Sequence, residues 1–404
     1  MSGDRPPVLL LGSGLTVLGA LRLLNRAGCD PVVLAGDAGI ATRSRHYRAA
    51  PRSSGSTPAE VDLPAYLEQL PLSRAVLLPC SDAWMLRVAR CAAVVAPRFP
   101  SAVSAAAVLE QLIDKWSLAR LLVELDLPHP RTIGLEPGEP LPPLDEIPMD
   151  RAFIKPRDSA PFFARFGTKG IKVASRAELI RQLERIAPSG LAVQLQEYVP
   201  GPSTNHFYVE GYIDRTAELR SLFVRQRGRM YPPDFGNSTS FESVAPAVVP
   251  DAVETVARLL AHVRFRGIFS VELKRDARDG ICKLIEINAR PWWYVEFAGQ
   301  CGANVLGHYV RDALGQPDTS DPGYEVGKRC VYPYYDYFAC RELHARHELS
   351  LAAWARSWLT ATQPVFRWSD PVPAVSASAT LVRDKITRAF SGRSREVAAA
   401  GRGA

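Results

Sequence analysis

The sequence has 404 residues and a formal net charge of +7, with 47% hydrophobic and 23% charged residues. This length suffices for two or three packed units, and the composition is ordinary for a folded globular protein, so disorder as the main state is excluded. The basic excess contains no compact Lys/Arg run with interleaved aromatic residues, which argues against nucleic acid as a partner. An anionic small-molecule substrate explains the sign of the charge equally well.

Cysteine usage and hydropathy indicate a reduced, cytoplasmic setting. The seven cysteines form no C-x-x-C pair, so neither a disulfide framework nor a zinc ribbon is expected. No stretch approaches the roughly 20 consecutive apolar residues of a membrane span, and the N-terminus lacks the pattern of a secretory signal. We therefore expect no membrane partner.

The first part of the chain alternates short apolar strands with helical segments. Residues 7–14 are typical of a buried parallel strand that ends in a glycine turn, and residues 15–28 carry apolar positions at helical spacing. Strands are expected at 31–34 and 76–79, with a helix around 84–92. This alternation predicts a doubly wound α/β domain.

The glycine turn departs from a dinucleotide-binding fingerprint. Gly12, Gly14 and Gly19 give G-x-G-x-x-x-x-G, and Ala35-Gly36 stands where an acidic residue would end the second strand. The pattern favours a tight turn beside a small-molecule pocket over nicotinamide binding. An NAD-dependent oxidoreductase nevertheless stays as an alternative.

The middle of the chain mixes helices with short strands. Two helices are expected within 103–125, the second capped by Asp114, and a strand at 152–156 carries Lys155 near its end. We expect 157–170 to be a long irregular loop whose aromatic residues fold down as a lid. A strand at 193–199, a hairpin of 206–213 with 219–227, and a helix at 251–263 follow.

Two late strands, 268–274 and 283–291, carry the strongest chemical signal. Side chains two apart on a strand point the same way, so Glu286, Asn288 and Arg290 share one face. The other face should be the apolar one and should hold Ile285, Ile287 and Ala289.

Folding this hairpin about Asp279 sets Glu272 directly opposite Glu286. Two opposed carboxylates repel each other unless a cation lies between them, and carboxylate and amide oxygens are hard ligands that suit Mg²⁺. An exposed hairpin with solvated carboxylates is the alternative. Lys155 can reach nucleotide phosphates, and residues 196–199 can offer backbone groups to a base. Taken alone, however, these two features are more often a solvated lysine and a plain strand.

In this order the segments resemble the ATP-grasp superfamily and its carboxylate–amine ligase branch. The resemblance covers about residues 7–315, and the segments that carry it are Asp114-Lys115, Phe153-Ile154-Lys155-Pro156, Gln196-Glu197-Tyr198-Val199-Pro200-Gly201, Phe269-Ser270-Val271-Glu272 and Glu286-Ile287-Asn288-Ala289-Arg290-Pro291. It implies an α/β and α+β fold, in which an N-terminal doubly wound (pre-ATP-grasp) domain precedes a two-subdomain ATP-grasp fold.

The domain limits expected on this basis run in chain order. They are a pre-ATP-grasp domain at 1–102, an N-terminal or lid subdomain at 103–198, a metal-binding C-terminal subdomain at 199–320, and an extension at 321–404. Residues 391–404 read as a disordered basic tail.

The resemblance also implies roles for individual residues. Residues expected to bind ATP are Lys115, Lys155, Lys169, Gln196, Glu197, Val199 and His206, the last loosely placed near the ribose. Residues expected to hold magnesium, with manganese as an alternative ion, are Glu272, Glu286 and Asn288. Residues expected to act on the transferred phosphoryl group or the substrate are Arg290, Arg227 and Arg225.

The reaction implied is ATP-dependent activation of a substrate carboxylate as an acyl phosphate, followed by attack of an amine and release of ADP and phosphate. The partners are a small carboxylate and an amine, both amino-acid-like, and a homodimer is left open. A thiol, hydroxyl or carbamate acceptor in place of the amine is one alternative. A nucleotide-binding module without catalysis is another.

Overall fold

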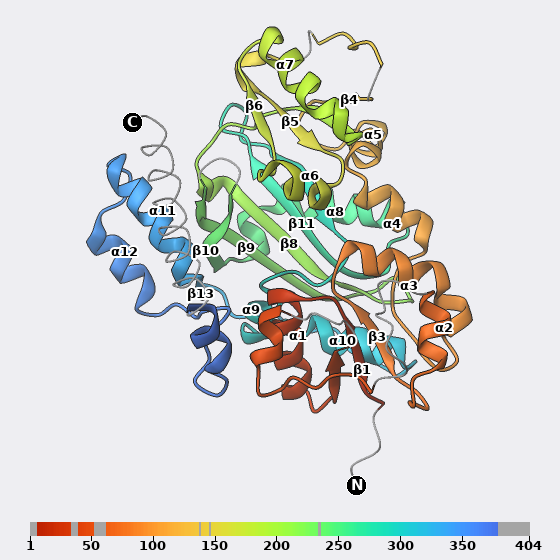
Figure 1. The fold of residues 1–404 in the computed structure, drawn as a ribbon. Coiled ribbons are helices and arrows are strands. Elements are labelled where there is room, and N and C mark those ends of the chain that lie inside the picture. The colour runs from red at the N-terminus through yellow and green to blue at the C-terminus, as the bar shows by residue number, and fades with distance from the viewer. Residues whose placement is uncertain are drawn as a thin grey trace, which may run out of the picture.

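The computed structural model describes residues 6–33, 39–51, 62–136, 139–144, 147–232 and 236–378. These residues form three β-sheets with helices packed around them (Figure 1). Figure 1 shows the N-terminal sheet at the bottom, the largest sheet in the middle and the smallest sheet at the top. In the part of the chain that the structure describes, no helix is both long and apolar enough to cross a membrane.

The N-terminal sheet is parallel, with the strand order β2-β1-β3 and helices on both faces. Its elements are β1 (Val8–Leu11), α1 (Gly14–Arg26), β2 (Pro31–Val33), α2 (Leu63–Glu68), β3 (Val76–Pro79) and α3 (Asp82–Val95). Leu10 packs toward α1, whereas its neighbour Leu9 packs toward α2 and α3. Both faces of each strand are therefore buried, and the predicted doubly wound arrangement is confirmed.

Two helices from much later in the chain complete the layer against α1. They are α9 (Val295–Gln300) and α10 (Val305–Ala313). A Cβ atom on Gly19 would lie 3.3 Å from the Cβ of Glu296, so this glycine permits the close approach of α1 and α9. Gly12 has φ +148° and forms the turn after β1. The spacing of these glycines thus follows turn geometry and helix packing. Ala35-Gly36 lies outside the described residues.

Helices α4 (Ala106–Ile113) and α5 (Lys115–Glu124) lead from this domain to the smallest sheet. Asp114 caps α5 as predicted, because its carboxylate accepts the backbone N–H of Ser117 at 2.7 Å. The sheet has the order β4-β7-β5-β6. Its elements are β4 (Thr132–Leu135), β5 (Ala152–Pro156), α6 (Ser159–Phe166), β6 (Ile171–Val173), α7 (Arg176–Ile186) and β7 (Val193–Glu197).

The expectation of an irregular lid loop at 157–170 is wrong, because α6 occupies its centre. Phe162 and Phe166 are four residues apart, so they share one helix face and pack against the core of the smallest sheet. Only Phe163 faces the cavity described below, and it is 53% exposed. Two of the three aromatic residues expected to fold the loop down, Phe162 and Phe166, therefore form the apolar stripe of a short helix.

The largest sheet has the order β12-β11-β8-β9-β10-β13, and all its neighbouring strands are antiparallel. Its strands are β8 (His206–Ile213), β9 (Leu219–Tyr231), β10 (Asn237–Ser243), β11 (Gly267–Arg275), β12 (Cys282–Asn288) and β13 (Arg329–Val331). One face packs on α8 (Pro250–His262), α4 and α5. Part of the opposite face packs on α9 and α10, and the rest is polar.

A β-bulge in β12 changes which of its side chains face the core. Glu272 pairs with Glu286, but the next residue, Leu273, pairs with Leu284, so Ile285 is the extra residue. Leu284, Ile287 and Ala289 are core residues, whereas Ile285 lines the cavity. The prediction that Ile285 shares the apolar face with Ile287 is therefore wrong, because strict alternation fails at the bulge.

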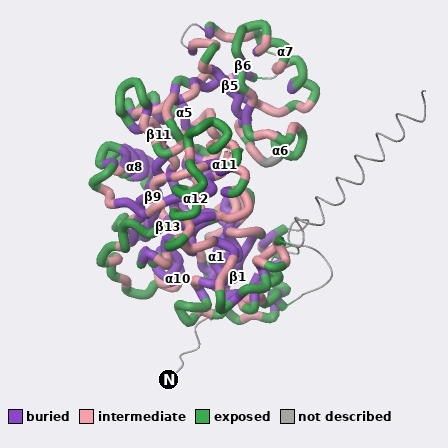
Figure 2. Tube along the Cα trace, turned by 90° about the vertical axis from the view of Figure 1, so that its left-hand side faces the viewer, coloured by how far each residue is buried: buried purple, intermediate pink, exposed green. Residues whose placement is uncertain are grey.

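The segment after residue 320 packs against both the largest sheet and the N-terminal domain. It adds the edge strand β13 and the helices α11 (Pro333–Ala345) and α12 (Leu351–Trp358). Arg22 in α1 is buried and bonds to the carboxylates of Glu296 and Asp370 at 3.1 and 2.9 Å. Figure 2 shows that α12 lies at the surface, and none of its residues is buried. The predicted disordered tail at 391–404 lies outside the described residues.

Candidate active site

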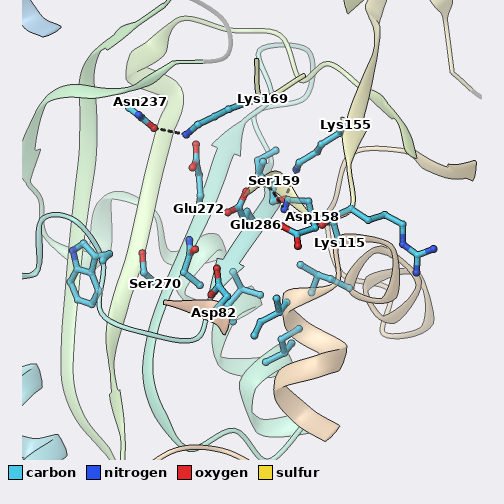
Figure 3. A pocket seen from close by; sticks show the side chains of 18 of the residues that line it. Asp82, Lys115, Lys155, Asp158, Ser159, Lys169, Asn237, Ser270, Glu272 and Glu286 are labelled. Carbon is cyan, nitrogen blue, oxygen red and sulfur yellow. Dashed lines mark hydrogen bonds between the residues drawn. The ribbon is translucent and has the colours of Figure 1, made fainter. Parts of the chain in front are cut away.

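The polar face of the largest sheet lines a cavity of about 1310 Å³. Strands β8, β9, β11 and β12 form its floor, and β5, β7 and the start of α5 form the wall opposite. The N-terminus of α3 closes one end through Ser81, Asp82 and Ala83. Three regions that are distant in the sequence therefore meet around one space (Figure 3).

Glu272 and Glu286 lie directly opposite each other on β11 and β12, as the sequence predicts, and both line the cavity. Glu272 Oε1 accepts hydrogen bonds from His206 Nδ1 at 2.8 Å and from Arg227 Nη2 at 3.0 Å. Burial alone would raise the pKa of Glu272, but Arg227 and His206 hold it well below its usual range. This carboxylate is therefore charged at neutral pH.

Glu286 differs from Glu272, since its side chain makes no hydrogen bond or ion pair with any described residue, although Lys155 feels its charge. Asn288 lies two residues further along β12, and its Oδ1 accepts a hydrogen bond from Arg290 Nη2 at 2.9 Å. Carboxylate and amide oxygens form the hard donor set that suits Mg²⁺. The described residues contain no group of three or more His, Cys, Asp or Glu that could hold a metal. Mg²⁺ usually also takes water and phosphate oxygens as ligands.

Lys155 on β5 and Lys115 at the start of α5 come from the wall opposite β12, and both side chains line the cavity beside Glu286 (Figure 3). Lys155 is 7% exposed, and its Nζ donates to Gln196 Oε1 at 3.3 Å and to the carbonyl oxygen of Ile285 at 3.2 Å. Burial lowers the pKa of Lys155 to about 8, with Glu286 acting against it and Lys115 adding to it. Lys115 Nζ donates to Ser159 Oγ at 3.1 Å.

Lys169 reaches across the cavity mouth between the two sheets. Its Nζ donates to Oδ1 of Asn237 in β10 at 2.6 Å, the bond drawn as a dashed line at the top of Figure 3. Lys169 follows α6 and so belongs to the smallest sheet. The structure thus brings together Lys115, Lys155 and Lys169, the three lysines that the resemblance assigns to ATP binding, along one cavity.

The predicted nucleotide hinge runs along the end of β7. Gln196 accepts from Lys155 and donates through Nε2 to Thr132 Oγ1 at 3.0 Å. The carboxylate of Glu197 accepts from Arg278, which lies in the turn between β11 and β12. This side chain is therefore occupied, and the backbone N–H of Glu197 also has a partner, because it donates to the carbonyl oxygen of Arg131 at 2.9 Å. Val199 is buried and lines the cavity.

His206, which the resemblance loosely places near the ribose, lies on β8 and contacts Glu272 of the acidic pair. Burial, with repulsion from Arg227, lowers the pKa of His206 to about 4, although Glu272 acts in the opposite direction. The ring is consequently neutral at pH 7. Its Nδ1–H donates to Glu272, which fixes the orientation of that carboxylate.

The three arginines predicted to act on substrate have different environments. Arg227 contacts Glu272 and Tyr208, and its Nε donates to Ser238 at 2.8 Å. Arg225 is instead paired with the buried carboxylate of Glu210 at 2.8 Å. Arg227 and Arg225 therefore form ion pairs with different acidic residues, Glu272 and Glu210, although both arginines line the cavity.

Arg290 contacts the N-terminal domain through Asp82, a partner that the sequence did not predict. Its Nε and Nη2 donate to the two carboxylate oxygens of Asp82 at 2.8 and 3.1 Å. Asp82 follows directly after a buried parallel strand, at the carboxyl end of the sheet, where α/β folds place ligands. That position is the signal that would have identified it. Arg278 had no such signal, since its turn carries no motif.

Comparison with known proteins gives one curated relative, and no protein-family model matches the chain. The relative is a D-aspartate ligase of Enterococcus faecium (strain Aus0004), 24% identical over 220 residues. The match covers 51% of this chain and 50% of the relative, so the chain matches about half the length of that protein.

Solved structures share the fold over most of the chain. An N5-carboxyaminoimidazole synthetase from Staphylococcus aureus in complex with ADP has a TM-score of 0.59 at 13% identity and covers 85% of this chain and 87% of that chain. An L-amino acid ligase from Bacillus licheniformis has a TM-score of 0.54 at 16% identity, with coverages of 78% and 76%. A carboxyaminoimidazole ribonucleotide synthase from Aspergillus clavatus in complex with ATP has a TM-score of 0.58 at 14% identity, with coverages of 81% and 82%. The chain therefore has the ATP-grasp fold.

Proposed function

We propose that the chain is an ATP- and magnesium-dependent ligase that activates a substrate carboxylate as an acyl phosphate for attack by an amine. The observation that carries the proposal is that the opposed pair of Glu272 and Glu286 lines one cavity together with Lys155 and Lys115. The solved structures with the same fold that hold ADP or ATP support nucleotide binding in such a cavity.

Glu272, Glu286 and Asn288 would hold the magnesium. When bound, the ion would neutralise negative charge on the nucleotide phosphates. His206 and Arg227 keep Glu272 charged and oriented for this task. Among the described residues no side chain competes for Glu286 through a hydrogen bond, so its oxygens are available to a ligand.

The lysines would bind the phosphates from the opposite wall. Lys155 and Lys115 are point charges on the smallest sheet and on α5, so they can stabilise charge that develops during transfer. Lys169 is held at the cavity mouth by Asn237 and would close over the nucleotide. The backbone at Glu197 and Val199 would meet the adenine.

The proposed reaction has two steps. A carboxylate oxygen attacks the γ-phosphorus, the new O–P bond forms, the bond between the β,γ-bridging oxygen and the γ-phosphorus breaks, and ADP leaves. A neutral amine then attacks the acyl carbon, the C–N bond forms, phosphate leaves with the bonding electron pair, and the amine releases a proton to solvent. Arg290 follows β12 directly after the proposed metal ligand Asn288 and Ala289, donates to Asn288, and would stabilise charge on the acyl phosphate.

Amino acids are the proposed substrates, because the curated relative is named a D-aspartate ligase and a solved structure with the same fold is named an L-amino acid ligase. A thiol, hydroxyl or carbamate acceptor would use the same acyl phosphate, and the mass of the product distinguishes these acceptors from an amine.

The test is ADP release with a panel of amino acids and small acids, together with candidate amines. We expect substrate-dependent ADP formation in the wild type, and at least roughly a hundredfold loss in Glu286→Gln and in Asn288→Ala, because both changes remove a metal ligand. Glu254→Gln is the matched control, since Glu254 is exposed on α8 and does not line the cavity. Full activity in both site variants, or nucleotide binding without any ADP formation, would contradict the proposal.

A further inference from the structure

The cavity continues beyond the acidic pair into a more buried end. Along the sheet, Glu272 pairs with Tyr208, whereas Ser270 pairs with Glu210 on one side and Asn288 on the other. Successive rows on one face of a sheet are roughly 7 Å apart. Figure 3 shows Ser270 and Asp82 on the side of Glu272 away from Lys155. This end is therefore next to the place where we propose the phosphates bind, but one row further in.

Two buried hydrogen-bond donors at this end have no partner. Arg225 and Trp292 both line the cavity and are 3% and 4% exposed. Among the described residues, neither Arg225 Nη1 nor Trp292 Nε1 finds a hydrogen-bond acceptor, and no other cavity-lining side chain has such an orphaned buried atom. A buried donor without a partner costs roughly 1–3 kcal/mol, so such groups are usually explained by a missing ligand or water.

The geometry of the arginine shows where its free donor points. Arg225 Nε and Nη2 bond to Glu210 at 3.0 and 2.8 Å, and Ser270 Oγ also donates to Glu210 at 2.8 Å. Nη1 is on the edge of the guanidinium that faces away from this carboxylate. The guanidinium carbon lies 3.6 Å from the ring centre of Tyr208, so the plane of the group is held by stacking.

The chemistry of the two free groups selects the ligand. Both are N–H groups that can only donate, so a ligand between them must present acceptors on both sides. A carboxylate has one acceptor oxygen for each donor and a charge opposite to that of Arg225, whereas an amide is neutral and has a single acceptor oxygen. Buried ion pairs such as Arg225–Glu210 contribute little to stability compared with apolar replacements, which favours a binding role for this one.

We propose that Arg225 and Trp292 form a subsite for a second, non-reacting carboxylate of the acid substrate. This inference rests on the proposed function and specifies its substrate class: a small dicarboxylic acid, whose reacting carboxylate lies toward Glu272 and Glu286. The subsite anchors the substrate one row away from the reaction, so it supplies binding energy without taking part in the transfer.

The experiment compares acids that differ by one carboxylate group. Protein saturated with Mg·AMP-PNP is titrated calorimetrically with D-aspartate, L-aspartate and succinate, and with their counterparts D-alanine, L-alanine and propionate. We expect at least one diacid to bind roughly tenfold or more tightly than its counterpart, as expected when a charged group gains hydrogen bonds.

Trp292→Phe keeps the ring but removes the N–H, and Arg225→Lys keeps the charge beside Glu210 but removes Nη1. In each variant the preference for the diacid should fall to about twofold or less. In Trp292→Phe the affinity for Mg·AMP-PNP should stay unchanged. Trp84→Phe is the control, since Trp84 lies on α3 and does not line the cavity. Thermal unfolding of each variant establishes that it is folded.

The outcomes separate this inference from the proposed function. Equal binding of diacid and monoacid by the wild type, no binding of any acid, or a preference that survives in folded Trp292→Phe would overturn the subsite and leave nucleotide binding intact. Failure of the wild type to bind Mg·AMP-PNP would instead overturn the proposed function itself.

Discussion

Two neighbours, His206 and Arg227, donate hydrogen bonds to the carboxylate of Glu272, and neither belongs to the hairpin whose pattern identified the site. His206 and Arg227 come from β8 and β9, and they meet Glu272 only because three antiparallel strands bring them into neighbouring rows. In the sequence, the proposed metal site is indicated by side chains that alternate between the two faces of one hairpin. The groups that orient its ligand come from strand pairing over longer distances, which alternation within a single strand does not encode.

Replacement of His206 by phenylalanine tests the role of the ring. We expect the magnesium concentration needed for half-maximal nucleotide binding to rise roughly 10- to 100-fold, because a residue that orients a metal ligand contributes about this much to metal affinity. The measurement is titration of magnesium at fixed AMP-PNP. His262→Phe, on the exposed end of α8, should leave the titration unchanged. An unchanged titration in His206→Phe would remove His206 from the site.

The pKa of Lys155, lowered to about 8 by burial, predicts a pH dependence of nucleotide binding. The protonated amine binds phosphate, and bound phosphate raises its pKa, so affinity should be constant below pH 8 and decline above it. The decline approaches tenfold per pH unit until the pKa of the bound state is reached. Titrations of Mg·AMP-PNP from pH 7 to 9.5 measure it. Lys155→Met should bind weakly at pH 7 and lack this decline, and the same decline in that variant would assign it to another group.

At the scale of elements, the sequence predicts most of the secondary structure that forms the site. The strands that carry Lys155, Glu197, Glu272 and Glu286 are all found where the apolar patterns place them. The exceptions have local physical causes. The bulge at Ile285 breaks the alternation of β12, and the loop expected before β6 contains α6, whose phenylalanines fill the core of the smallest sheet.

One buried carboxylate, Asp336, bonds the helices α11 and α12 to the largest sheet. Asp336 is fully buried and accepts from Arg229 at 2.8 and 2.9 Å, and also from Thr239, Trp354 and Trp358. Removal of one partner leaves the charge of Arg229 uncompensated. We expect Asp336→Ala to lower the free energy of unfolding by about 3–5 kcal/mol in urea denaturation followed by tryptophan fluorescence.

A surface carboxylate on the same helix is the control for the loss of a negative charge without burial. Glu342 pairs with Arg346 at 2.7 Å on the surface of α11, and its replacement by alanine should change the free energy of unfolding by less than about 0.5 kcal/mol. Equal effects of the two substitutions would show that Asp336 does not anchor these helices.

At the scale of the whole molecule, the cavity exists because three parts of the chain meet. Asp82 and Arg290 are 208 residues apart, and Lys169 and Asn237 are 68 apart, yet each pair joins two walls of the same space. No local pattern predicts such partners, since each depends on how whole sheets pack. The resemblance to a known fold predicts that the walls come together, but not which side chains bridge them.

The central claim is that Glu286 and its partners bind nucleotide through a divalent ion, and the binding of AMP-PNP measured with magnesium and with EDTA tests it most directly. We predict that the wild type binds AMP-PNP at least roughly tenfold more tightly with magnesium than with EDTA, and that Glu286→Gln loses this difference. Equal affinity of the wild type under both conditions, or a full magnesium effect in Glu286→Gln, would contradict the account.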